Sequence, residues 1–343
     1  MRASVLRNGS MVYRDDVPEP VPGPGQVLIK VDTCGVCGGD LHFAKHSSTM
    51  VELAGEMVGA PSLTDGLDLS QDVFMGHEYT GEVLAAGPDT EAPAPGTVVT
   101  SMPALISDRG MEPRLYSNTQ PGGYAEQMLL SAPLVLTVPN GLDSRLAALT
   151  EPMAVGLHAV NKADIAPGTG AIVIGAGPAG LAVVAELAAA GVAPIVASDF
   201  SPARRKLARA MGAHNVVDPA TDDVFEAWQR TGTGTPVVFE AVGAPGMLDT
   251  ILRQTPFGTR VVVVGGMMEP DRLRPYFGIA KEAEFRFIQA YTPDEFAETL
   301  RQIADGELDV EPLITAEVGL KDVAWAFDEL GNPEEHCKIL VKP

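Results

Sequence analysis

Four side chains of this sequence have the chemical types of metal ligands and stand at turns between predicted elements. Cys37 follows a predicted strand, His77 and Glu78 are adjacent, and Glu151 lies where the texture of the sequence changes. One thiolate, one imidazole and one or two carboxylates form a donor set that suits Zn²⁺. Three protein ligands leave a fourth position open, which a catalytic zinc needs and a structural zinc does not. The set therefore indicates a catalytic metal.

Cys34 and Cys37 form a Cys-x-x-Cys motif, which could instead be a redox pair or half of a zinc knuckle. The sequence has no second Cys-x-x-Cys, and this pair does not begin a β-α-β unit. We therefore expect Cys34 to be a core residue. With Cys337 there are three cysteines, too few for a disulfide framework, which is typical of a reducing compartment.

A second motif could cradle a dinucleotide, and it comprises Gly175, Gly177, Pro178, Ala179 and Gly180. It ends the apolar run AIVIGAG and opens the Ala-rich run PAGLAVVAELAAAG. Glycines here permit a tight turn, close approach of the backbone to a pyrophosphate, and close packing of helix against strand. The helix N-terminus then presents unpaired N–H groups to the phosphates. An ordinary tight strand–helix turn is the alternative reading.

An acidic residue at the end of the next predicted strand favours the cofactor interpretation. Asp199 ends PIVASD, and a carboxylate there accepts hydrogen bonds from ribose hydroxyls and repels a 2′-phosphate. We therefore predict NAD rather than NADP. Arg204 and Arg205 argue the other way, because arginines at this point can bind a 2′-phosphate, unless they form a solvated helix face.

The elements that must position these residues divide the chain into two domains of an α/β protein. Residues 1–147 contain short β-type runs broken by Gly and Pro, which predicts an irregular β domain. Residues 148–290 alternate apolar strands with helices, the pattern of a doubly wound parallel (Rossmann) sheet. We expect residues 291–343 to return to the first domain, which would then be discontinuous.

The overall composition limits the possible partners. The 343 residues carry a net charge of −21, which argues against binding to nucleic acid because phosphates require clustered Lys and Arg. We find no membrane-spanning apolar run and no apolar segment of a signal peptide at the N-terminus, so we expect a cytoplasmic protein that does not engage membranes.

Segments distributed over nearly the whole chain carry a resemblance to a known family. In order they are CGVCGGDLH, GHEYTGEV, GGYAEQMLL, TEPMAVGLHAV, GAGPAG and HCKILVKP. The chain resembles zinc-containing medium-chain alcohol dehydrogenases. The resemblance implies a GroES-like catalytic domain beside the Rossmann domain, an active site in the cleft between them, and assembly into a homodimer or homotetramer.

The resemblance also implies roles for the candidate ligands. Cys37 and His77 look like zinc ligands, and Glu78 looks like the carboxylate that ligates or exchanges at the metal. Glu151 resembles the glutamate of the sorbitol and diol branch, where it contacts zinc directly or through water. Whether Glu78 or Glu151 ligates directly stays open.

The same resemblance implies roles for three further residues. Asp40 looks like the partner that orients His77, His42 like the end of a proton relay, and Lys338 like the basic residue that approaches the pyrophosphate. The sequence departs from the family at Gly39, where a Ser or Thr hydroxyl usually passes on the proton of the alcohol. Water or Glu151 would have to fill that gap.

Two other departures concern whole segments. Residues 95–122 contain no cysteine, so we expect one catalytic zinc and no structural zinc. Residues 43–75 resemble the extended segment of 2,3-butanediol dehydrogenases and would lie near the substrate mouth.

We expect the enzyme to transfer a hydride from a small alcohol to NAD, which gives a ketone or an aldehyde. Zinc would lower the pKa of the alcohol. Val242, Gly243 and Gly265 follow strands and would contact the cofactor at the sheet's carboxyl edge. We expect a secondary alcohol, vicinal diol or polyol as substrate. Alternatives are a zinc-free quinone or enoyl reductase, a threonine-type dehydrogenase, and a catalytically impaired nucleotide-binding homologue.

Overall fold

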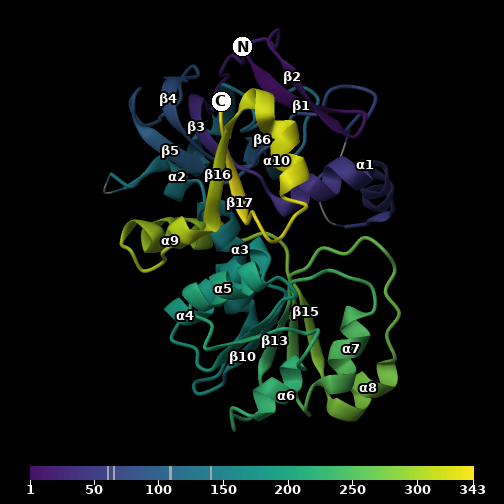
Figure 1. Ribbon diagram of the computed structural model, residues 1–343. Coiled ribbons are helices and arrows are strands. Elements are labelled where there is room, and N and C mark those ends of the chain that lie inside the picture. Colours follow the sequence, from purple (N-terminus) through teal and green to yellow (C-terminus); the bar gives the residue numbers. More distant parts are fainter. Residues whose placement is uncertain (60–61, 65, 108–109, 140) are drawn as a thin grey trace.

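The chain forms two domains, one above the other in Figure 1, with both termini in the upper one. A computed structural model describes residues 1–343 except 60–61, 65, 108–109 and 140. Among the described residues, no helix is long and apolar enough to cross a membrane.

The upper domain is built on a mixed sheet with the strand order β16-β17-β3-β4-β5-β9, and β8 also pairs with β3. The bounds are β3 Gln26–Gly35, β4 Glu78–Ala86, β5 Val98–Ser101, β8 Gln127–Ser131, β9 Val135–Thr137, β16 Ile314–Gly319 and β17 Lys338–Lys342. Leu340 of β17 lies opposite Gly35 of β3 in an antiparallel pair. This pairing brings the last strand of the chain beside the turn that carries Cys37.

Smaller elements complete this domain. Two hairpins are formed by β1 (Ala3–Arg7) with β2 (Ser10–Arg14) and by β6 (Ala104–Ser107) with β7 (Gly110–Pro113). The short helices are η1 (Ala132–Leu134), η2 (Glu311–Leu313), η3 (Leu320–Asp322) and α10 (Val323–Glu329).

A helical segment, α1 (Gly38–Glu56), which is kinked at His46, corrects the expectation of an all-β region over residues 1–147. Its N-cap is Cys37, whose sulfur accepts a hydrogen bond from the backbone of Gly39. The paired glycines at its start disfavour a helix in a sequence-based reading, and the cap offsets their cost. The helix is amphipathic only at its beginning, where Asp40 and Phe43 are buried.

The lower domain is a parallel sheet with the strand order β12-β11-β10-β13-β14-β15, and helices lie on both faces (Figure 1). This confirms the predicted Rossmann architecture. The strands are β10 (Ala171–Ile174), β11 (Ile195–Ser198), β12 (Asn215–Val217), β13 (Val237–Glu240), β14 (Arg260–Val263) and β15 (Glu284–Phe287). The helices are α4 (Pro178–Ala189), α5 (Pro202–Ala210), α6 (Val224–Gln229), α7 (Met247–Gln254) and α8 (Pro275–Lys281).

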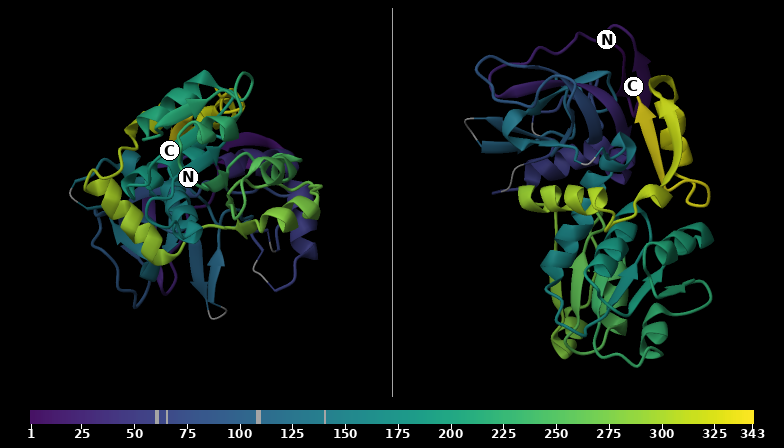
Figure 2. Two further views of the ribbon diagram at one scale, coloured as in Figure 1. Left: turned by 90° about the horizontal axis from the view of Figure 1, so that it is seen from below. Right: turned by 90° about the vertical axis from the view of Figure 1, so that its left-hand side faces the viewer.

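Helices at the junction connect the domains (Figure 2). They are α2 (Ser144–Ala147), α3 (Thr150–Ala163) and α9 (Pro293–Ala304), and α3 packs against both α4 and α9. His158 of α3 lies 2.7 Å from the carboxylate of Glu295 on α9. Glu151 occupies the first turn of α3, so its side chain is supplied by the junction itself.

Candidate active site

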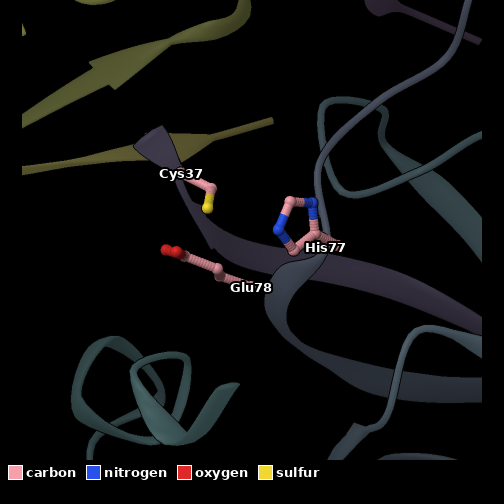
Figure 3. A group of neighbouring side chains, drawn as sticks. All are labelled: Cys37, His77 and Glu78. Atoms are coloured by element: carbon pink, nitrogen blue, oxygen red, sulfur yellow. The ribbon is translucent and has the colours of Figure 1, made fainter. Parts of the chain in front are cut away.

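Three of the predicted ligands converge on one point. Ligand atoms of Cys37, His77 and Glu78 all lie within 4.8 Å of one another, and the three side chains face the same space in Figure 3. Cys37 comes from the turn between β3 and α1, and Glu78 is the first residue of β4. Gly76, with φ +97°, makes the turn before His77, and a Cβ there would meet the backbone nitrogen of Tyr124 at 2.8 Å. Adjacent antiparallel strands thus deliver all three side chains.

The carboxylate of Asp40 lies beside the imidazole of His77, at ion-pair distance. Nδ1 of His77 lies 3.4 Å from Oδ1 of Asp40, and both side chains are buried. The hydroxyl of Tyr124 donates a 2.6 Å hydrogen bond to the other oxygen of Asp40. Burial alone would lower the pKa of His77, but Asp40 and Cys37 outweigh it and hold that pKa well above its usual value. Surroundings that favour a proton on the imidazole also favour a metal cation there.

Glu78 is held by a buried lysine. Nζ of Lys338 lies 2.7 Å from each carboxylate oxygen of Glu78 and 3.1 Å from the carbonyl oxygen of Val36. Lys338 is 2% exposed and Glu78 is 0% exposed. Burial opposes charge on the ammonium, yet Glu78 and Cys37 raise the pKa of Lys338 above its usual value. Glu78 would therefore have to share its charge between this lysine and a metal.

The other candidate glutamate, Glu151, has a different environment. Its carboxylate accepts a 2.9 Å hydrogen bond from the hydroxyl of Tyr291. Burial raises the pKa of Glu151 to about 7, with His77 acting to lower it and Glu78 to raise it. Glu151 stands outside the group of three whose atoms lie within 4.8 Å of one another. It belongs to the first turn of α3, and its hydrogen-bond partner is a phenol rather than a cation.

These residues fit a zinc ion by their chemistry. A thiolate, an imidazole and a carboxylate converge, and Asp40 supports the imidazole as metal-bound histidines require. In the part of the chain that the structure describes, a second possible ligand group comprises Glu329, Glu335 and His336. It has no thiol and is partly exposed, as clusters of surface carboxylates commonly are.

His42 lies on α1, one turn beyond Gly39, and outside the ligand group. Partial burial lowers the pKa of His42, and the positive charges of His46 and Lys45 act in the same direction. A neutral imidazole at this place can accept a proton.

The glycine motif of the lower domain has the backbone geometry that dinucleotide binding needs. Gly175 has φ +92°, and a Cβ on Gly180 would lie 1.9 Å from the carbonyl oxygen of Gly175. Helix α4 begins at Pro178, with Ala179 in its first turn and Gly177 as its N-cap. A Cβ on Gly177 would meet only Nη1 of Arg204, at 3.9 Å. The first and last glycines are thus required by packing, whereas Gly177 borders open space.

Asp199 is anchored beside this motif. Its carboxylate accepts 2.8 Å hydrogen bonds from the backbone N–H groups of Ala176 and Ser201. Arg205 pairs with Asp218 and donates to the carbonyl oxygen of Asp199. Two arginines were considered as ligands of a 2′-phosphate. The guanidinium of Arg205 is therefore taken up by contacts within the lower domain, whereas that of Arg204 approaches the glycine motif.

The loops after β13 and β14 contact each other at the carboxyl edge of the sheet. A Cβ on Gly265 would lie 2.3 Å from the backbone nitrogen of Gly243. Glu240 ends β13 and accepts 2.8 Å hydrogen bonds from the N–H groups of Val242 and Gly243, and burial raises its pKa. Glu240 is not among the residues predicted from the sequence, although an acidic residue ending the strand PVVFE could have revealed it.

Comparisons with known proteins agree with this geometry. The model of the alcohol dehydrogenase GroES-like domain matches residues 23–140, and the model of the zinc-binding dehydrogenase matches residues 178–305. The (R,R)-butanediol dehydrogenase of Bacillus subtilis is 32% identical over 360 aligned positions, which cover 100% of each chain. The chain belongs to the zinc-type medium-chain alcohol dehydrogenases.

Further relatives place this dehydrogenase among alcohol and polyol oxidoreductases. Sorbitol dehydrogenase of Bacillus subtilis is 26% identical, and the match covers 100% of this chain and 97% of the relative. The crystal structure of 2R,3R-butanediol dehydrogenase from Bacillus subtilis superposes with a TM-score of 0.83 at 31% identity, covering 100% of this chain and 99% of the other. The predicted family, fold and enzyme class are confirmed.

Three tyrosines of this dehydrogenase were also missed from its sequence. Tyr124 supports Asp40, Tyr291 binds Glu151, and Tyr116 donates a hydrogen bond to the carbonyl oxygen of Gly39. Each contacts a residue more than 70 positions away in the chain. Only Tyr124 lay in a motif of the family, GGYAEQMLL, where it could have been singled out.

Proposed function

We propose that this enzyme oxidises a secondary alcohol, vicinal diol or polyol to the corresponding carbonyl compound with NAD, using one catalytic zinc per chain. The observation that carries the proposal is the convergence of Cys37, His77 and Glu78 within 4.8 Å. The names of the relatives, butanediol and sorbitol dehydrogenases, support a substrate with two or more hydroxyl groups.

Cys37, His77 and one of the two glutamates would hold the metal. When bound, zinc supplies a Lewis acid that lowers the pKa of an alcohol and stabilises its alkoxide. Asp40 fixes the ring of His77, and Lys338 offsets the buried charge of Glu78. Glu151, held by Tyr291, is placed to ligate the metal or to accept a hydrogen bond from the second hydroxyl of a diol.

The nucleotide domain would bind NAD along the carboxyl edge of its sheet. Asp199 stands where a carboxylate would accept hydrogen bonds from ribose hydroxyls and repel a 2′-phosphate, and its position beside the glycine motif supports NAD. The proposed cofactor contacts are Gly175, Gly177, Pro178, Ala179, Gly180, Asp199, Arg204, Val242, Gly243, Gly265 and Lys338. Lys338 is buried and its ammonium is engaged by Glu78 and Val36, so the proposed contact with the pyrophosphate would require it to leave Glu78.

We also propose domain boundaries, an oligomeric state and a cellular compartment for this enzyme. We assign residues 1–147 and 291–343 to the catalytic domain and 148–290 to the nucleotide domain, as the two main sheets support. Phe287, 72% exposed on the terminal strand β15, supports a homodimer or homotetramer. The thiol of Cys37 and the free, buried Cys34 and Cys337 support a reducing, cytoplasmic compartment.

The test is a dehydrogenase assay with NAD and NADP on 2,3-butanediol, sorbitol, apolar secondary alcohols and L-threonine, after zinc analysis of the same sample. We expect NADH formation with a diol or polyol and a clear preference for NAD. Activity on threonine alone would favour the threonine-type enzyme, and protein without stoichiometric zinc would favour a zinc-free reductase. Bound zinc without activity on any substrate would favour a catalytically impaired homologue.

A further inference from the structure

A tyrosine hydroxyl occupies the neighbourhood of the side chain that Gly39 lacks. A Cβ built on Gly39 would lie 3.9 Å from the hydroxyl oxygen of Tyr116 and 3.5 Å from the sulfur of Cys37. The hydroxyl of Tyr116 donates a 3.3 Å hydrogen bond to the carbonyl oxygen of Gly39. A hydroxyl group is therefore present beside position 39, two residues after the candidate metal ligand Cys37, although it comes from a distant part of the chain.

The ring of Tyr116 is fixed in this position. It stacks on Phe43 with ring centroids 3.8 Å apart and ring planes 11° apart. Phe43 is buried on α1, the same helix that carries Gly39, and Tyr116 is only 6% exposed. The stacked pair thus holds the hydroxyl against the first turn of α1.

The charges around Tyr116 keep its hydroxyl protonated. Burial raises the pKa of Tyr116 well above its usual value, and the negative charges of Asp40, Cys37 and Glu151 add to the increase. The hydroxyl itself lies at the first turn of α1, where it contacts the carbonyl oxygen of Gly39. A neutral hydroxyl both donates and accepts a hydrogen bond, so it can take up one proton while releasing another.

We propose that the hydroxyl of Tyr116 replaces the missing hydroxyl at position 39 and passes the proton of the substrate alcohol out of the site. The alcohol O–H bond breaks as the phenol oxygen accepts that proton. The phenol's own O–H turns from the carbonyl oxygen of Gly39 to a water, and its proton leaves through that water towards His42, one turn further along α1. The phenol is thus regenerated, and the hydride goes to the nicotinamide as in the proposed reaction. The inference rests on the proposed function and names a positioning and proton-transfer residue within it.

The decisive variants are Tyr116→Phe and the double variant Tyr116→Phe with Gly39→Ser. Phenylalanine keeps the stacked ring and removes only the hydroxyl. A serine Cβ at position 39 meets Cys37 and Tyr116 at ordinary contact distances, so it should fit. We expect kcat for alcohol oxidation to fall about 100-fold in Tyr116→Phe, at the lower end of the contribution of acid–base groups, and to recover at least tenfold in the double variant. Tyr276→Phe, at an exposed tyrosine, is the matched control.

A second readout does not depend on turnover. Trifluoroethanol, which resists oxidation, is mixed with the zinc- and NAD-loaded protein, and the proton released is followed with an indicator dye. We expect Tyr116→Phe to slow this release at least tenfold, the double variant to restore it, and zinc content and Tm to match those of the wild type.

Three results would overturn the inference: undiminished proton release and kcat in Tyr116→Phe, loss of zinc in that variant, or no recovery in the double variant. Failure of the proposed function itself would look different. In that case the wild type would form no NADH or would hold no zinc.

Discussion

The candidate metal centre and the candidate dinucleotide site at the carboxyl edge of the Rossmann sheet are built in opposite ways. At the metal centre, charged side chains are buried and held by one another, as Glu78 is by Lys338 and His77 is by Asp40. At the dinucleotide edge, the backbone shapes the site, because Gly175 and Gly180 approach too closely to allow a Cβ. The carboxylates of Asp199 and Glu240 stabilise the loops there by accepting hydrogen bonds from backbone N–H groups.

Because the two regions are built differently, the same kind of substitution should have different effects in each. At the metal centre, deleting one side chain leaves an uncompensated buried charge or an incomplete ligand set. At the dinucleotide edge, adding one methyl group displaces the backbone. Deletions should therefore be most harmful in the first region and additions in the second.

The largest expected effect is that of His77→Ala. Loss of the imidazole removes one of the three side chains proposed to hold zinc, so we expect loss of bound zinc and a fall in kcat/KM of at least about 1,000-fold, equivalent to roughly 4 kcal/mol. Zinc analysis and steady-state kinetics measure both. His336→Ala is the control, since it removes the histidine of the second ligand group. Retention of zinc by His77→Ala would break the distinction between the two groups.

Next come two alanine substitutions within one motif. Gly180→Ala places a Cβ 1.9 Å from a backbone oxygen, so we expect it to destabilise the protein by about 2 kcal/mol and to weaken NAD binding about 100-fold. Gly177→Ala meets only Arg204, so we expect an unchanged Tm and weaker NAD binding alone. Thermal melts and NAD titrations distinguish them. Equal losses of Tm would show that packing does not separate the two glycines.

The features that could be predicted from the sequence depend on residues close together in the chain, and those that could not depend on residues far apart. Cys37, His77 and Glu78 stand in short motifs, and the apolar runs of the Rossmann sheet are continuous, so both could be predicted. The attachment of Lys338 to Glu78 joins residues 260 positions apart. No spacing rule gives such a contact, which arises only when β17 pairs with β3. Tyr116 escaped prediction for the same reason.

A smaller effect is expected for Asp199→Ala. The variant loses charged hydrogen bonds worth about 1.5–3 kcal/mol each, so we expect the preference for NAD over NADP to fall at least tenfold. The ratio of kcat/KM for the two cofactors measures it. Asp309→Ala, at an exposed aspartate outside the nucleotide domain, is the control. An unaltered preference in Asp199→Ala would place cofactor selection elsewhere.

The smallest effect concerns stability alone and lies away from both sites. Glu186 is buried on α4, and burial, with the charge of Glu298, raises its pKa to about 8. The folded protein keeps this proton up to about pH 8, whereas the unfolded chain releases it near the usual value of 4.5. Stability present below pH 4.5 is therefore lost as pH rises to 8.

We expect Glu186→Gln to abolish this loss and to be more stable than the wild type at pH 9 by a few kcal/mol, with little difference at pH 5. Denaturant unfolding at both pH values measures it, with Glu269→Gln, at an exposed glutamate of the same domain, as the control. A difference independent of pH would mean that Glu186 is charged in the folded protein throughout.

Zinc stoichiometry is the most direct test of the central claim, that Cys37, His77 and a glutamate hold one catalytic metal. Metal analysis and native mass spectrometry of the wild type and of Cys37→Ser, both purified without chelator, provide it. We expect one zinc per chain in the wild type and none in Cys37→Ser. Wild-type protein without zinc, or Cys37→Ser that retains a full zinc ion, would contradict the account.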